Sequence, residues 1–341
     1  MKHLTLFLFA LFISFTLTAQ EKTEVRKLIE EGIKLHDTAK YEEAISKYKE
    51  ALTLEPDNTD ANYEIALTYF NTTAKKDAIP YLQKIVQTKN SSTVMAYDML
   101  GSIYDIDNKP DQAIEFFNRG IKADPTYQRI YFNLAITYAR QGKSAEAELN
   151  TSIALKLDPG HASSHRLYAI VAAGEQGNKI KAVLAYCNFL LLEATTPRSA
   201  TAYKDLKALL GAGVSEKDGV NNITLGGNSA DKDINAANMA IPLSLLSAKA
   251  IPNLGDADQL ELQLKTIFNI TGELAAKKTD KDFFWSYYPI YFAKLAKTEF
   301  MPVAAHIISF SANPEENKKW ISEHSQELEG FLKWQNKNPR K

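Results

Sequence analysis

The stretch that decides the fold is QRIYFNLAITYARQGKSAEAELNTSIALKLDPGH, residues 128–161. It combines small and large side chains at helical spacing with a glycine turn and a closing proline: Leu134, Ala135, Tyr138, Gly142, Ala147, Ala154 and Pro159. Small side chains at Ala135 and Ala147 allow two antiparallel helices to approach closely. Pro159 stops the second helix, because proline has no amide hydrogen. The stretch therefore predicts a helical hairpin.

The same pattern recurs upstream with a period of 34 residues. Pro56 and Pro125 close two earlier copies as Pro159 closes this one. The copies are 25–58, 59–92 (without the final proline), 94–127 and 128–161, with a degenerate fifth copy at 162–196. Unrelated amphipathic helices would not keep six positions in phase over four copies.

These residues resemble the tetratricopeptide repeat, whose pattern places a small and a large residue on each helix and a proline at the end. The resemblance implies an all-α fold in which helical hairpins stack over residues 25–196 into a right-handed superhelical solenoid. It also implies that the first helix of each hairpin lines a concave groove suited to a peptide or helix.

In this family the groove positions are the second, fifth, ninth, twelfth and thirteenth of each repeat. Here they are Arg26, Ile29, Ile33, His36, Asp60, Tyr63, Leu67, Phe70, Asn71, Met95, Asp98, Ser102, Asp105, Arg129, Phe132, Ile136 and Arg140. Family members that clamp a C-terminal carboxylate use Lys and Asn at several of these positions. The fifth position here is Ile29, Tyr63, Asp98 or Phe132, so that clamp is not expected. The alternative for every groove residue is packing between helices.

The N-terminus predicts export. Lys2 and His3 precede an apolar run of 14 residues, Leu4–Leu17, and the chain turns polar at Gln20. A run this short is typical of a cleaved signal peptide over residues 1–19, not of a membrane helix, which needs about 20 residues. Its ending resembles the signal peptides of Gram-negative bacteria of the Bacteroidetes type, which implies a periplasmic or secreted protein.

The single cysteine, Cys187, lies far from the cleavage site, so a lipoprotein is not expected, and no internal disulfide can form. The 341 residues carry 40 Lys and Arg against 41 Asp and Glu. This balance gives no basic surface for nucleic acid.

From residue 199 to 341 the 34-residue phase is lost, and no family resemblance is evident. Residues 211–235 are rich in Gly, Asn, Asp and Ser and predict a loop, with at most a short strand over 220–225. Helical patterns then resume, so we expect a helical C-terminal domain. Its predicted helices are 236–250, 257–277, 281–296, 300–311 and 315–336.

No residue pattern predicts a catalytic, metal or cofactor site. His161 and His165 have metal-ligand spacing but no third ligand nearby, and two exposed histidines are the simpler interpretation. Asp105–Pro110 and Asp231–Asn235 begin like calcium loops, but neither completes the pattern. Cys187 lies on an apolar helix, where a buried structural thiol is expected.

The aromatic cluster Phe283–Phe292 predicts core, although Trp285 could form a sugar-binding or peptide-binding platform if exposed. The sequence therefore favours an exported, non-enzymatic scaffold that binds a protein or peptide in the groove, with an unknown oligomeric state. The alternative is a C-terminal domain that binds or processes a cell-envelope glycan and is recruited by the repeats. Exposure of Trp285 beside paired acids would favour this alternative, and its burial the scaffold.

Overall fold

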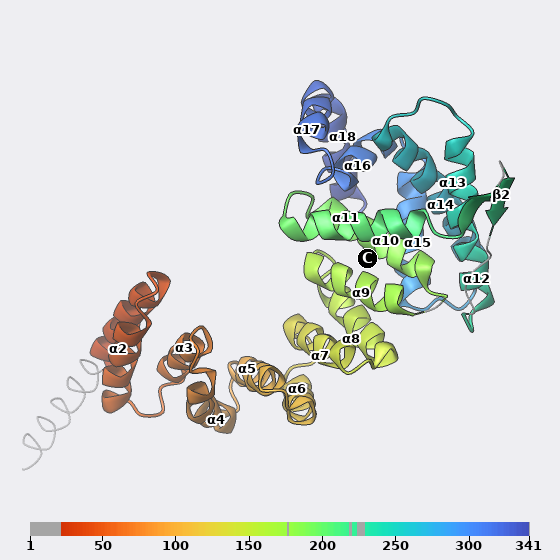
Figure 1. Cartoon of the computed structure of the whole chain (residues 1–341). Helices are drawn as coiled ribbons and strands as arrows, with labels where there is room; N and C mark the ends of the chain where they lie inside the picture. Colours follow the sequence, from red (N-terminus) through yellow and green to blue (C-terminus); the bar gives the residue numbers. More distant parts are fainter. Residues whose placement is uncertain (1–21, 176, 218–219, 224–228, 341) are drawn as a thin grey trace, which may run out of the picture. The chain divides into compact units, whose positions relative to one another are not determined.

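The structure, a computed structural model, describes residues 22–340 except 176, 218–219 and 224–228. The predicted signal peptide, residues 1–19, lies outside the described residues. The chain forms two compact units, Met1–Thr137 and Tyr138–Lys341. Both are helical, which confirms the predicted all-α class (Figure 1).

The first unit consists of helices that pack in antiparallel pairs. In chain order it contains a helix over residues 22–37, α2 (Tyr41–Leu54), α3 (Thr59–Phe70), the 3-10 helix η1 (Lys75–Ala78), α4 (Ile79–Thr88), α5 (Thr93–Ile106), α6 (Pro110–Ala123) and most of α7 (Gln128–Arg140). In the first three predicted repeats, one helix lies at the start of the repeat and a second helix near its end.

The turn within the hairpin uses the left-handed backbone region at one fixed repeat position. Ala39, Asn108 and Gly142 occupy that position in the first, third and fourth repeats, with φ values of 58°, 57° and 70°. The second repeat differs, since η1 precedes α4, and Lys89 adopts a φ of 52° at the end of α4, which lacks the closing proline.

Close helix packing in the third repeat depends on Gly101. A Cβ atom built on Gly101 would lie 2.5 Å from Cε1 of Phe117, a ring that is almost fully buried. The absence of a side chain on α5 therefore makes room for the large side chain of α6, as the alternation of small and large residues predicts.

The second unit is built around α10, whose residues are buried on almost every side. The unit contains the rest of α7, α8 (Ser144–Leu157), α9 (Ala162–Gly174), α10 (Lys179–Leu192), α11 (Pro197–Leu210), β1 (Val214–Lys217), β2 (Val220–Ile223), α12 (Lys232–Asn238), α13 (Ala240–Lys249), α14 (Asp256–Lys277), α15 (Phe283–Leu295), α16 (Met301–Ile308), α17 (Pro314–Glu323) and α18 (Ser325–Lys337).

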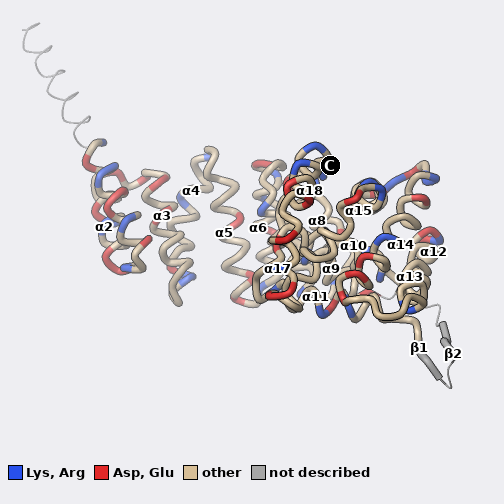
Figure 2. The backbone as a smooth tube through the Cα atoms, turned by 90° about the horizontal axis from the view of Figure 1, so that it is seen from above, with Lys and Arg blue, Asp and Glu red and all other residues tan. Residues whose placement is uncertain are grey.

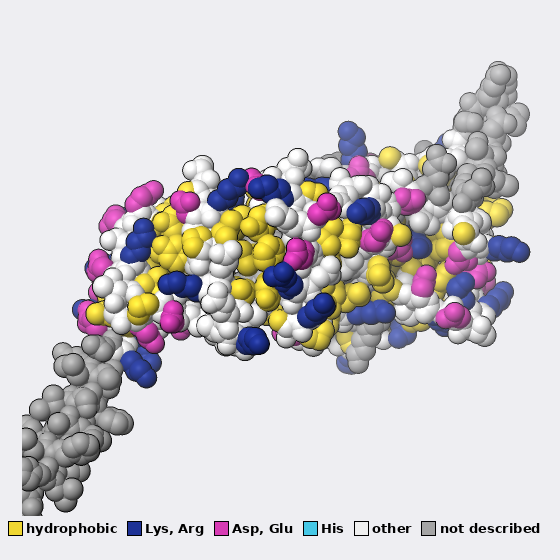
Figure 3. Space-filling view, turned by 90° about the horizontal axis from the view of Figure 1, so that it is seen from below, with side chains coloured by type: hydrophobic (Ala, Val, Ile, Leu, Met, Phe, Trp, Pro, Cys, Tyr) yellow, Lys and Arg dark blue, Asp and Glu magenta, His cyan; other side chains and the backbone are white. Residues whose placement is uncertain are grey.

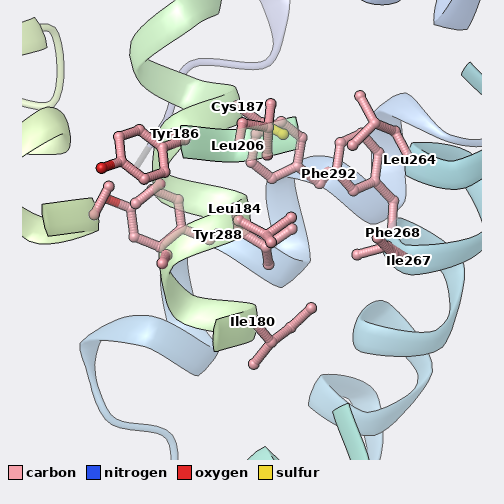
Figure 4. Close-up of a cluster of buried hydrophobic side chains, with 14 of the residues drawn as sticks. Ile180, Leu184, Tyr186, Cys187, Leu206, Leu264, Ile267, Phe268, Tyr288 and Phe292 are labelled. Carbon is pink, nitrogen blue, oxygen red and sulfur yellow. The ribbon is translucent and has the colours of Figure 1, made fainter. Parts of the chain in front are cut away.

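One hydrophobic core joins the fifth repeat-like hairpin to the later helices. Figure 4 shows Leu184 and Cys187 of α10 beside Phe268 of α14 and Phe292 of α15. The rings of Phe268 and Phe292 stack with centroids 4.3 Å apart. The domain boundary predicted between residues 196 and 199 therefore lies inside the second unit.

Three local features differ from the predicted elements. The helix predicted over 236–250 is divided between α12 and α13, and α12 begins at Lys232, inside the predicted loop. Within the loop predicted over 211–235, β1 and β2 form an antiparallel hairpin in which Val214 pairs with Ile223. The helix predicted over 315–336 is divided into α17 and α18 at His324, whose φ of −116° and ψ of 41° are not helical.

Candidate functional site

The first helices of the repeats carry a hollow in the first unit, which we call the anchor pocket. Its volume is about 220 Å³, and its lining comes from α3, α5, α6 and α7: Phe70, Ser102, Asp105, Ile106, Phe117, Arg129, Asn133 and Ile136. Phe70, Ser102, Asp105, Arg129 and Ile136 are predicted groove residues. The structure thus brings groove positions of three successive repeats to one place.

A buried carboxylate holds one side of the anchor pocket in position. Asp98 on α5 is only 2% exposed. Its Oδ1 accepts a hydrogen bond of 2.8 Å from Nδ2 of Asn133, and its Oδ2 lies 3.2 Å from Nε of Arg129. Burial raises the pKa of the Asp98 carboxyl to about 6, although both α7 partners act to lower it. Arg129 itself stays largely exposed, and its side chain also forms a hydrogen bond with Tyr127.

Tyr63 on α3 belongs to the same polar surroundings. Burial raises the pKa of its hydroxyl, and by smaller amounts Arg129 lowers this pKa while Asp98 raises it. The ring packs partly against the core cluster around Leu100. Tyr63 is half-buried and contributes to helix packing.

The remaining groove residues lie outside the anchor pocket. Arg26, Ile29 and Asp60 line a hollow of about 320 Å³ at the N-terminal end of the unit. His36 lies 2.7 Å from Oγ1 of Thr68 and 3.2 Å from Nδ2 of Asn71, so it ties its helix to α3.

Several predicted groove side chains contribute to packing. Ile29 belongs to the buried core cluster that includes Tyr48, and Ile33 packs against that cluster. Leu67 packs against the core cluster around Leu100. Met95 and Phe132 are half-buried. Arg140 is exposed and belongs to the second unit.

Sequence reasoning did not select Asn133 or Ile106 as site residues. Asn133 lies one helical turn after Arg129 on α7, so both side chains reach Asp98 from the same helix face. The four-residue spacing between Arg129 and Asn133 is the feature of the sequence that could have indicated a role for Asn133. Ile106 is 54% exposed at the end of α5, and the sequence does not distinguish it from a buried isoleucine.

The expectation that His161 and His165 are both exposed is wrong, since His161 is half-buried and His165 is buried. Trp285 is fully buried, and its indole N–H donates to Oδ2 of Asp231 at 3.2 Å. His165 is also fully buried, and burial lowers its pKa to about 3. Cys187 has the predicted burial. No three metal-ligating side chains cluster among the described residues.

Charge is mixed over both units. Figure 2 shows basic and acidic residues interspersed along the helices, and the face in Figure 3 shows apolar patches between charges of both signs. Within the described ranges, no helix has both the length and the hydropathy required to cross a membrane.

Comparisons with known proteins agree with this architecture. Models described as a TPR repeat and as a tetratricopeptide repeat match residues 34–72, 96–127 and 116–148. The chain is 27% identical over 183 residues to Protein O-mannosyl-transferase Tmtc3 of Drosophila melanogaster, covering 52% of this chain and 20% of that protein. It is 27% identical over 176 residues to TPR repeat-containing protein YpiA of Bacillus subtilis, covering 49% of this chain and 40% of that protein.

The chain thus spans well under half the length of each of these relatives. Among solved structures, a chain described as Pseudomonas aeruginosa pilF is 18% identical, with a TM-score of 0.49, over 55% of this chain and 86% of that one. Together, the three family matches and the repeated helical hairpins identify the chain as a tetratricopeptide repeat protein, a class of protein-interaction scaffolds.

Proposed function

We propose that the first helices of the first unit bind an extended segment of a protein partner, and that the anchor pocket receives one apolar side chain of that segment. The observation that carries this proposal is the convergence of three repeats on the pocket. At about 220 Å³ it is smaller than the roughly 300–1,000 Å³ of most small-molecule sites. It is therefore better suited to a single side chain than to a whole ligand.

The composition of the anchor pocket supports this use. Apolar and polar side chains contribute equally to the lining: Phe70, Ile106, Phe117 and Ile136 on one hand, and Ser102, Asp105, Arg129 and Asn133 on the other. An apolar centre with a polar margin is the usual anatomy of a protein interface. An anchor side chain in such a pocket contributes about 2 kcal/mol or more to binding.

The partner segment would meet a surface that is already organised. Arg129 is fixed through Nε by Asp98, and Asn133 is committed to the same carboxylate. Binding would therefore immobilise few additional side chains, which reduces the entropic cost of association.

We also propose that the chain is exported and acts without enzymatic activity, in the periplasm or outside a Gram-negative cell. Support comes from the N-terminal sequence, which changes from apolar to polar at Gln20 and has no cysteine there. Measuring the intact mass of the protein recovered from the cell envelope tests this proposal. A mass that includes residues 1–19 would contradict export by cleavage.

The alternative function, a C-terminal domain that binds or processes a glycan, depended on an exposed Trp285. Trp285 is fully buried, so it offers no sugar-stacking face. The transferase name of the Drosophila relative adds little, since the match covers only 20% of that protein. The interaction scaffold is the better supported function.

Selection from a random peptide library against the full chain tests peptide binding. Selected peptides should share an apolar residue, and Ser102→Phe, which fills the anchor pocket, should weaken them by about thirtyfold, corresponding to about 2 kcal/mol. Gln112→Phe is the matched control, because it adds the same ring at an exposed position of α6. Peptides that bind Ser102→Phe as tightly as the parent would place the binding site elsewhere.

A further inference from the structure

The second unit contains a hollow of about 330 Å³, which we call the C-terminal pocket. Tyr287, Ile290, Tyr291 and Lys294 line it from α15, and Lys337 lines it from the end of α18. Its volume falls within the range of sites that hold small molecules. Apolar and cationic side chains share this lining, so the pocket offers two kinds of contact to one ligand.

The cationic side of the pocket lacks compensating acids. Lys294 and Lys337 are exposed, and within the described part of the chain neither forms an ion pair. Other surface lysines of this unit do form them, as Lys333 does with Glu329 at 2.6 Å. The two pocket lysines therefore remain available to an anion from outside.

Arg340 adds a third cation beside the pocket, and it is held in place. Its Nε donates a hydrogen bond of 2.6 Å to Oδ1 of the fully buried Asn188. Its guanidinium carbon lies 4.7 Å from the centroid of the Tyr291 ring, a cation-π distance. Its Nη2 is buried and has no hydrogen-bond partner among the described residues.

A guanidinium without a carboxylate partner leaves its positive charge uncompensated, so Arg340 favours an anion in its neighbourhood. Arg340 forms no ion pair with any carboxylate in the described ranges. One acid does lie close enough to act on the pocket, since Asp158 raises the pKa of the Tyr287 hydroxyl. Arg340 acts on the same hydroxyl in the opposite direction and lowers its pKa.

We propose that the C-terminal pocket binds a small molecule that carries an oxyanion, a carboxylate or a phosphate, on a flat apolar group. The oxyanion contacts Lys294 and Lys337, which line the pocket, and Arg340 adds positive charge from beside it. The flat group lies against Ile290 and the few atoms of Tyr287 and Tyr291 that reach the pocket, since both rings are otherwise buried. This contact removes apolar surface from water. This site belongs to the second unit and does not depend on peptide binding by the first.

Calorimetric titration of the full chain tests the proposal with four probes: phenyl phosphate, benzoate, benzyl alcohol and inorganic phosphate. At least one of phenyl phosphate and benzoate should bind saturably, and the tighter of the two identifies the oxyanion. Benzyl alcohol should bind at least about tenfold more weakly, because it lacks the charge. Inorganic phosphate should also bind more weakly than phenyl phosphate, because it lacks the ring.

The double variant Lys294→Gln/Lys337→Gln should weaken the binding probe by about tenfold or more. Lys318→Gln, an equal loss of charge at an exposed position of α17, should leave affinity unchanged. Circular dichroism of each variant establishes that the helices are intact. Absence of binding by both aromatic anions, equal binding of benzyl alcohol, or undiminished affinity in the folded double variant would each overturn the proposal.

Discussion

Replacing Asp98 by Asn should remove a specific pH dependence from the stability of the first unit. The folded carboxyl has a pKa of about 6, against 3.8 for an unperturbed aspartate, because burial disfavours its charged form. The difference is about 2.2 pKa units at about 1.4 kcal/mol each, or about 3 kcal/mol.

The sign follows from which state keeps the proton. Below pH 3.8 the carboxyl is protonated in both states, and between pH 3.8 and about 6 only the folded state retains the proton. The free energy of unfolding therefore falls as pH rises through this window, by about 3 kcal/mol in total. Asp98→Asn has no proton to lose, so the fall should be absent from the variant.

Urea unfolding of both proteins at several pH values measures the effect. All three tryptophans lie in the second unit, so tryptophan fluorescence follows that unit alone, whereas circular dichroism follows both. The difference in the free energy of unfolding between parent and variant should change with pH when it is measured by circular dichroism. It should not change with pH when it is measured by tryptophan fluorescence. A difference that is the same at pH 4 and pH 7 would refute the assignment of the raised pKa to Asp98.

Three further predictions concern packing and turns. Gly101→Leu should lower the free energy of unfolding by about 1–3 kcal/mol or more, because the new side chain meets the buried ring of Phe117. Gly174→Leu is the control, since nothing lies within 4 Å of the added Cβ, and it should lower the free energy of unfolding far less in the same denaturation assay. Ala39→Gly should stabilise by about 1 kcal/mol, because alanine is strained at a φ of 58°; an unchanged denaturation midpoint would argue against that turn. Cys187 should react with a thiol reagent only at the rate of unfolding, since the side chain is fully buried and burial raises its pKa; fast modification of the native protein would contradict this.

The repeat hairpins were predictable because their pattern reflects local packing. Gly101 and Phe117 belong to the two helices of one hairpin, so their small and large side chains recur with the repeat. The turn residues Asn108 and Gly142 are likewise fixed by the backbone conformation at one repeat position.

Features that depend on several elements were not predictable. The repeat position of Asp98 predicts which face of its helix it lies on. How deeply its side chain is buried depends on the neighbouring helices that pack over it, which the repeat position does not show. The break at His324 has no proline or glycine to mark it. In the structure Trp320 stacks between His306 and His324 at centroid distances of 3.8 and 3.9 Å, a contact that requires α16 and α17 to be in place first.

The ion pair between Asp98 and Arg129 connects the stability and the proposed function of the first unit. A buried carboxylate is costly, and an ion pair whose cation is largely exposed contributes little to stability. Stability alone is therefore a weak reason for Asp98 to be there, whereas placing Arg129 at the anchor pocket is a direct geometric consequence of it. If this reasoning holds, Asp98→Asn should remain well folded at neutral pH yet bind selected peptides less tightly than the parent, because Arg129 loses its charged partner. A variant that loses stability and keeps full peptide affinity would show that the pair serves the fold instead.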